Sequence, residues 1–168
     1  MFKRILLALD GSESGQVAIS FTIALAASYQ AQVRIVHVSQ AELDGRGLTC
    51  MTPYDARYLV DDATLRFRCA WVTATGVARL APATTTRSVS ESIADEARRW
   101  GADAIVLGSR RRRGVRRVTS RGVREQVTRL SCLPVLTAPA PLRVTSADLA
   151  QELAPAPGRR GPISGLHH

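Results

Sequence analysis

The sequence predicts an α/β protein: a three-layer sandwich in which a five-stranded, mainly parallel sheet carries helices on both faces. Short apolar segments that suit buried strands alternate along the chain with longer segments of helical periodicity. Parallel strands need crossover connections, which helices supply, so this alternation is typical of an α/β sheet. The 168 residues, 45% of them hydrophobic, suffice for one domain with a sizeable core.

Five segments have the character of strands. "ILLAL" at 5–9 is a continuous apolar run, which fits a strand buried on both faces. The run "ADAIVLGS" is the clearest of all, and "VARLAPATTT" the weakest, because Pro82 ends it or places it near a sheet edge. The predicted strands are residues 5–9, 31–39, 77–86, 102–109 and 132–139.

Four segments between and after these strands have helical periodicity. The first begins beyond Asp10-Gly11, and the second spans 54–74. Ser90 is expected to cap the third helix, and the fourth follows an arginine-rich stretch. Trp71 and Trp100 fall on apolar helix faces, so we expect both to pack in the core.

The remaining segments are expected to be irregular. Residues 41–53 contain glycines and a proline and are predicted to form a loop. From Pro139 onward the chain is rich in Ala, Pro and Gly. We therefore predict one domain over 1–139 and a mostly disordered tail over 140–168.

Positive charge is concentrated in one place. The net charge is +9, and the window Arg110–Arg124 holds eight arginines and no acid, so the rest of the chain is nearly neutral. A local cluster of this kind suggests an anionic ligand more than a general solubility effect. Lys3 is the only lysine, however, so the stretch also reflects a general preference for arginine.

Ligands of open α/β sheets bind beyond the carboxyl ends of the strands. Three turns of this kind are visible: Asp10-Gly11-Ser12, His37-Val38-Ser39, and the turn that begins at Gly108-Ser109. The last is the most heavily charged, and a helix N-terminus there already favours anions.

Four segments of the chain together resemble a known protein family. "KRILLALDGSE", "VRIVHV", "ARRWGADAIVLGSR" and "CLPVLTAP" occur in this order over residues 1 to about 140. Together they resemble the universal stress protein family, and the strongest pair is "GADAIVLGSR" with "CLPVL" about 20 residues later. The resemblance implies a Rossmann-like fold of the adenine nucleotide alpha hydrolase type. It also implies a homodimer that pairs its last strands, here Pro134–Ala138, and, in some members, ATP as a cofactor together with Mg²⁺.

ATP-binding members of that family share a motif written G-x2-G-x9-G-(S/T), which this chain matches only in part. Gly108 takes the first position, and Ser109 follows it. The second glycine falls on Arg111, the third on Arg121, and the hydroxyl residue on Gly122. Gly108, Asp10 and Val38 are the family positions that match. The resulting nucleotide-binding candidates are Asp10, Ser12, Val38, Gly108, Ser109, Gly114, Gly122 and Val123, and the anion-contact candidates are Arg110, Arg111 and Arg121.

Two interpretations of the arginine-rich loop stay open. In the first, the side chains of Arg111 and Arg121 crowd the phosphate cradle, and ATP binding of the family type is weakened or lost. In the second, guanidinium groups replace the backbone contacts and hold another nucleotide, a polyphosphate or a nucleic acid backbone. A solvated charged surface is a third possibility. The stretch lacks interleaved aromatic residues, which disfavours nucleic acid.

Several candidates also have a purely structural interpretation. Asp10 suits the cap of a turn as well as a nucleotide contact, and Ser12 suits a helix cap better than a ligand contact. The Ser109 hydroxyl could bond its own turn. His37 lies in an apolar run and is expected to be a structural histidine.

The sequence offers little for catalysis. It contains no G-x-S-x-G elbow and no G-x-x-x-x-G-K-[ST] loop, and no spacing of carboxylates, His or Cys predicts acid–base or metal chemistry. We predict no catalytic residues, no metal ligands, and at most slow ATP hydrolysis. The apolar runs fall short of the ~20 residues that span a membrane, and the N-terminus lacks a signal-peptide layout. We therefore expect a cytoplasmic protein, and the resemblance implies a dimeric binding or regulatory module of the stress response.

Overall fold

A computed structural model describes the chain in six ranges, which are residues 1–40, 42–44, 47–49, 51–81, 86–109 and 122–139. The strands of its main sheet are β1 Arg4–Leu9, β2 Gln32–Gln40, β5 Ala74–Ala81, β6 Ala104–Leu107 and β7 Val135–Thr137. The helices are α1 Glu13–Tyr29, α2 Pro53–Cys69, α3 Thr86–Trp100 and α4 Val123–Leu130.

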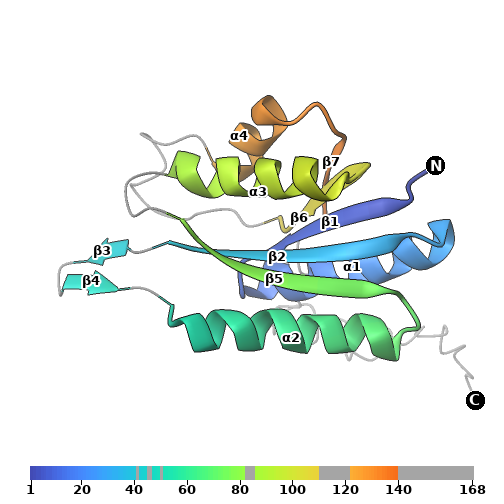
Figure 1. The fold of residues 1–168 in the computed structure, drawn as a ribbon, viewed down its shortest axis with the longest axis horizontal. Coiled ribbons are helices and arrows are strands. Elements are labelled where there is room, and N and C mark those ends of the chain that lie inside the picture. Colours follow the sequence, from blue (N-terminus) through green and yellow to red (C-terminus); the bar gives the residue numbers. More distant parts are fainter. Residues whose placement is uncertain (41, 45–46, 50, 82–85, 110–121, 140–168) are drawn as a thin grey trace, which may run out of the picture.

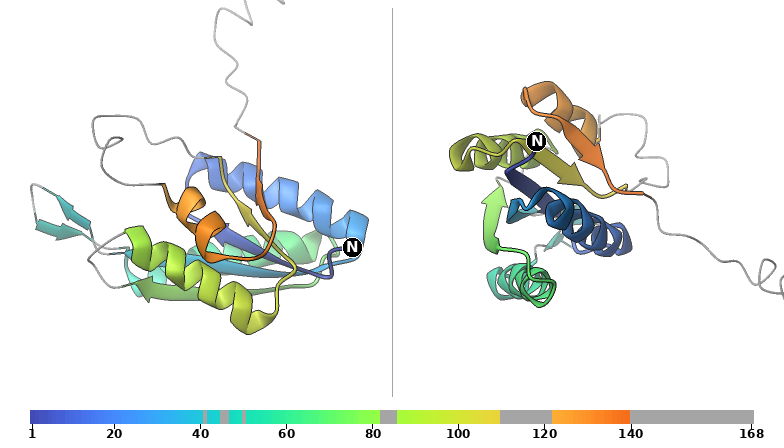
Figure 2. Two further views of the ribbon diagram at one scale, coloured as in Figure 1. Left: turned by 90° about the horizontal axis from the view of Figure 1, so that it is seen from above. Right: turned by 90° about the vertical axis from the view of Figure 1, so that its right-hand side faces the viewer.

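The five strands form one parallel sheet in the order β5-β2-β1-β6-β7. Helices α1 and α2 cover one face, and α3 and α4 cover the other (Figures 1 and 2). The predicted three-layer α/β fold is therefore confirmed. Every pair in this sheet is parallel, and β5 is an edge strand, as Pro82 suggested.

The central strands are apolar on both sides because both sides are buried. Ile5 and Leu7 pack in the core that α1 and α2 cover, whereas Leu6 packs in the core that α3 and α4 cover. All three are fully buried, and each such side chain stabilises the fold by about 1.5–3 kcal/mol relative to an exposed one. This alternation explains why "ILLAL" is continuous in apolar character.

Two predictions about irregular segments need correction. Within the predicted loop 41–53, β3 Glu42–Asp44 and β4 Gly47–Thr49 pair as an antiparallel hairpin. The predicted strand 132–139 is shorter, because only Val135–Thr137 pair with β6. The predicted tail, 140–168, and the loop 110–121 lie outside the described residues.

Two predictions about helices are also wrong. Helix α2 ends at Cys69, and Trp71 follows in a left-handed conformation (φ 59°) with 96% of its surface exposed. Trp71 has therefore left the helix face that its spacing suggested, while Trp100 does pack against the core under α3. Ser90 lies inside α3, which begins at Thr86, and its buried hydroxyl donates to the carbonyl of Val123 (3.4 Å). None of the helices in the described ranges is long and apolar enough to cross a membrane.

Candidate functional site

Three of the candidate residues lie at one edge of the sheet. Ala8 of β1 is in register with Leu107 of β6, and Leu9 of β1 is in register with His37 of β2. Asp10 and Gly108 therefore follow these strands at their carboxyl ends, and Val38 lies beside them near the end of β2. In Figure 1 this edge is the end of the sheet opposite the N-terminus. The structure thus brings together the positions that ligands of α/β sheets use.

Asp10 and Ser12 build the turn between β1 and α1. One Asp10 carboxylate oxygen accepts hydrogen bonds from the Ser12 N–H (3.0 Å) and the Ser12 hydroxyl (2.6 Å). Ser12 is the N-cap of α1, and its oxygen accepts from the N–H of Gly15 (3.3 Å). Gly11 supports the turn with a φ of +73°, which favours glycine. The helix-cap interpretation of Ser12 is confirmed, and Asp10 contributes to the same turn.

Gly108 lies directly against the first turn of α1. A Cβ atom at Gly108 would come within 3.2 Å of the Ser14 carbonyl oxygen and 3.3 Å of its carbonyl carbon, which is tighter than ordinary contacts. The absence of a side chain therefore allows the end of β6 to approach α1 closely. Ser109 turns toward β7, where its hydroxyl donates to the carbonyl of Pro139 (3.1 Å). The hydroxyl therefore has a structural partner, but that partner lies in the segment after β7 and not in its own turn, where the structural interpretation expected it.

Helix α4 begins without a side-chain cap. Its N-cap is Gly122, which makes no side-chain hydrogen bond, and no described atom lies within 4 Å of a Cβ placed there. Val123 is half-buried and accepts from Ser90, as described above. The positive dipole end of this helix, which no Gly122 side chain caps, suits an anion. The other candidates of the loop, Gly114, Arg110, Arg111 and Arg121, lie outside the described residues.

β2 carries two buried polar groups at the same edge. The Nδ1 of His37 lies 2.8 Å from the carbonyl oxygen of Leu9, which supports the structural interpretation of this histidine. Among the residues that the structure describes, His37 Nε2 and the Ser39 hydroxyl have no hydrogen-bond partner. The predicted base-contact residue, Val38, lies between them and packs toward α3 and α4.

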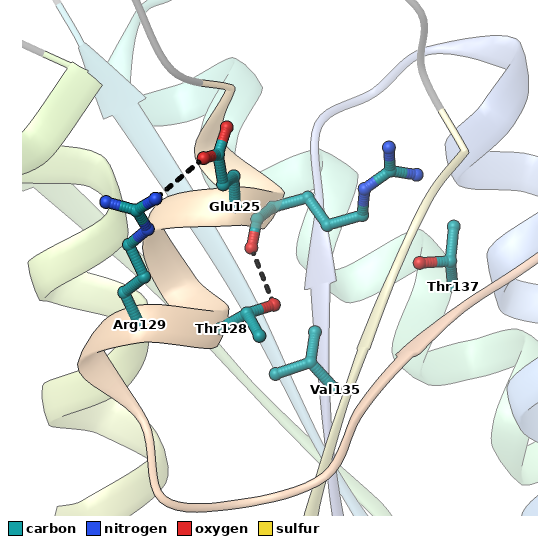
Figure 3. Close-up of a pocket in the computed structure, with 6 residues that line it drawn as sticks. Glu125, Thr128, Arg129, Val135 and Thr137 are labelled. Atoms are coloured by element: carbon teal, nitrogen blue, oxygen red, sulfur yellow. Dashed lines mark hydrogen bonds and ion pairs between the residues drawn. The ribbon is translucent and has the colours of Figure 1, made fainter.

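A pocket of about 420 Å³ lies between α4 and the edge strand β7 (Figure 3). Glu125 accepts from Arg129 across one helical turn (3.1 Å), and the Thr128 hydroxyl donates to the carbonyl of Arg124 (3.0 Å). The pocket is lined by Arg124, Glu125, Thr128, Arg129, Val135 and Thr137. Arg124, the last of the eight clustered arginines, belongs to the first turn of α4 and lines this pocket beside the outer strand β7.

Sequence reasoning missed a second charged site, which we call the Glu96 cluster: Glu96, Arg34, Arg79 and Arg99. Glu96 is buried on the sheet side of α3, where its two oxygens meet Arg34 Nε of β2 (3.1 Å) and an Arg79 nitrogen of β5 (2.8 Å). Arg99 of α3 lies 3.5 Å from the same carboxylate. Burial alone would raise the pKa of the Glu96 carboxyl, but the hydrogen bonds and charges of Arg79 and Arg34 outweigh burial and hold the pKa below its ordinary value. The cluster is therefore an ionised carboxylate with three arginines.

Comparisons with known proteins agree with this geometry. A sequence model described as the universal stress protein family matches residues 1–139. A solved protein of that family from Burkholderia pseudomallei is 29% identical, over 82% of this chain and 96% of that chain, with a TM-score of 0.59. No match was found among curated protein sequences.

Two further solved structures carry nucleotides. A universal stress protein from Archaeoglobus fulgidus in complex with dAMP is 19% identical, over 80% of this chain and 96% of that chain, with a TM-score of 0.55. A protein of the family from Arabidopsis thaliana with AMP bound is 16% identical, over 80% and 90%, with a TM-score of 0.55. At these identities the likeness concerns the fold.

Proposed function

Because the chain belongs to the universal stress protein family, we propose that it is a cytoplasmic binding or regulatory module of the stress response in which ATP binding of the family type is weakened or lost. One observation carries the proposal: Arg111 and Arg121 occupy two of the three glycine positions of the family's phosphate motif. Glycine lets backbone N–H groups approach phosphate oxygens closely, and a Cβ with a long side chain at both positions removes that approach.

The described residues are consistent with a binding module whose first half is intact. Gly108 keeps its close contact with α1, and Asp10 stands at the matching end of β1. Asp10, however, already accepts two hydrogen bonds from Ser12, so one of its oxygens is committed to the turn. The proposed defect lies in the second half of the phosphate-binding motif, at Arg111 and Arg121 in the loop before Gly122.

Calorimetric titration with ATP and Mg²⁺ tests the proposal. We expect the wild-type protein to bind ATP no more tightly than the millimolar range, and we expect the triple variant Arg111→Gly, Arg121→Gly, Gly122→Ser to gain at least tenfold, or about 1.4 kcal/mol. The matched control is Arg112→Gly, Arg117→Gly, Gly122→Ser, which loses the same charge from the same loop at positions outside the motif. Micromolar ATP binding by the wild type, or equal gains in both variants, contradicts the proposal.

A second candidate function is retained binding of an adenine nucleotide. It is favoured by the uncapped N-terminus of α4 and by the relatives solved with dAMP and AMP. Here guanidinium groups of the loop would replace the missing backbone contacts. Micromolar binding of AMP or ATP by the wild type, lost on substitution of Gly108, would establish it.

The eight clustered arginines favour a polyanion as a third candidate. Binding through about eight phosphate contacts should weaken by about 10³–10⁵ between 50 and 200 mM salt. A nucleotide held at the sheet edge would show a much smaller salt dependence. Titration of a single-stranded oligonucleotide and of polyphosphate at both salt concentrations separates these candidates.

We also propose a homodimer through Pro134–Ala138. In the described sheet β7 is an edge strand, and an unpaired edge favours association. The Ala138 N–H donates to Leu107 (2.9 Å), so by strand alternation the Thr137 N–H points away from β6 toward that edge. We expect a dimeric mass by light scattering at micromolar concentration, lost in Thr137→Pro and kept in Thr137→Val. A monomeric wild type overturns the proposal.

A further inference from the structure

The Glu96 cluster holds more positive charge than its carboxylate can balance. Three guanidinium groups, from β2, β5 and α3, meet one carboxylate, which leaves a surplus of two positive charges. Among the described residues, no other carboxylate pairs with any of these three arginines. A single arginine would neutralise a buried glutamate, so neutralising Glu96 does not explain the other two.

Most hydrogen-bond donors of the three arginines remain available. Each guanidinium has five N–H groups in a planar fork. In the described hydrogen bonds, Arg34 Nε and one Arg79 nitrogen donate to Glu96, and Arg34 Nη1 donates to the Thr75 hydroxyl (3.1 Å). The other N–H groups of these three arginines make no hydrogen bond within the described residues.

Burial within the cluster increases toward the carboxylate. Glu96 is 2% exposed, whereas the side chains of Arg34, Arg79 and Arg99 are 27%, 40% and 61% exposed. The carboxylate thus forms the floor, and the arginines open to solvent above it. Arg34 is also oriented from two sides, by Glu96 and by Thr75. Side chains held in this way lose less conformational entropy when they bind a ligand.

The cluster lies on β2, β5 and α3, whereas Asp10 and Gly108 follow β1 and β6. Arg34 is in register with Leu6 of β1 and with Thr75 of β5, near the start of both β2 and β5. Arg79 lies on β5, at the opposite side of the sheet from β7, and is in register with Val38 of β2. Helix α3 covers this part of the sheet (Figure 1). A ligand here would contact guanidinium groups of β2, β5 and α3 rather than the glycine positions of the phosphate motif.

We propose that Arg34, Arg79 and Arg99 form a second anion site, which binds a phosphate group, either as inorganic phosphate or as the phosphate of a small monoester. A phosphate group carries about −1.5 to −2 charges near pH 7, which matches the surplus. Arginine forks also match phosphate oxygens in geometry. Glu96 acts as an internal counter-ion that orients the arginines and limits their affinity, since it competes for the same N–H groups. The inference does not depend on ATP binding.

Calorimetric titration of the full chain with inorganic phosphate, which measures its affinity, tests the site. We expect Arg79→Gln with Arg99→Gln to weaken binding at least tenfold while Arg34 still balances Glu96. The matched control is Arg57→Gln with Arg98→Gln, which removes the same charge from two exposed arginines paired within their own helices, and should change the affinity less than twofold. Both double variants keep the arginine-rich loop, so phosphate that binds to the loop contributes equally to the affinities of both. Equal affinities in the two double variants overturn the proposal.

Two further arms sharpen the result. Glu96→Gln removes the competing carboxylate, so we expect it to bind phosphate more tightly than the wild type and to regain thermal stability as phosphate is added. A closed ion-pair network predicts only lost stability, with no rescue by phosphate, and would count against the proposal. If the wild type also binds glycerol phosphate, and the Arg79→Gln, Arg99→Gln variant loses affinity for it to the same extent, the ligand is a phosphate monoester. If the wild type binds inorganic phosphate but not glycerol phosphate, the ligand is the free ion.

Discussion

Helices α1 and α4 begin at the carboxyl ends of neighbouring parallel strands, yet their N-termini differ. The N-terminus of α1 is satisfied within the protein, since Ser12 caps the helix and Asp10 accepts from Ser12. The N-terminus of α4 is capped by Gly122, which offers no side-chain acceptor. The start of α1 therefore has a side-chain cap, whereas the start of α4 has none from its N-cap residue.

This difference indicates that the α1 side and the α4 side of the candidate nucleotide site have different roles, one in folding and one in ligand binding. The α1 side provides a rigid wall, because the Asp10 turn and the contact of Gly108 with Ser14 fix the positions of β1 and β6. The α4 side provides the anion-attracting end of a helix. Changes on the α1 side should therefore affect folding first, and changes at the start of α4 should affect ligands more than folding.

The largest expected effect comes from closing the contact between β6 and α1. In Gly108→Val the added Cβ meets the Ser14 backbone, which cannot yield as a flexible side chain would. We expect the free energy of unfolding to fall by about 2 kcal/mol, as for other overpacked sites. The control is Gly122→Val, where no described atom lies near the added Cβ; the cost there should stay below about 1 kcal/mol, the usual range for a poorer N-cap. Urea denaturation measures both, and equal losses would contradict the proposed rigid wall.

Much of the fold was predictable because a strand that is buried on both faces of the sheet has a continuous run of apolar residues. The run at 5–9 and the run "AIVL" within 102–109 are continuous in apolar residues, and both lie in inner strands of the sheet, β1 and β6. The hairpin of β3 and β4 has no such run, since its strands have three residues each. The prediction that Trp71 lies in the core was wrong because the helical spacing of apolar residues continues past Cys69, where α2 ends. Spacing alone does not show where a helix ends.

The candidate nucleotide site was predictable in outline, and the Glu96 cluster was not. Asp10, Val38 and Gly108 follow apolar runs, so their common edge follows from parallel pairing. Glu96 did leave a signal, because it follows the inner-face residue Ile93 by three positions, which places it on the same face of the helix. Its partners could not be named among 23 basic residues, since the pairing with Arg34 and Arg79 depends on sheet register and on where α3 crosses the sheet.

The smallest expected effects come from exchanging the two caps. Ser12→Ala removes the acceptor for Gly15 and one donor to Asp10, and should lower the free energy of unfolding by about 1 kcal/mol. Gly122→Ser supplies an acceptor where α4 has none, and should raise the same quantity by a few tenths of a kcal/mol. Thermal or urea denaturation of both variants, with the wild type alongside, measures the pair. If Gly122→Ser stabilises the protein as much as Ser12→Ala destabilises it, the start of α4 is an ordinary helix end that merely lacks a cap. A gain near zero, with tighter nucleotide or phosphate binding, would instead show that its N–H groups are kept for a ligand.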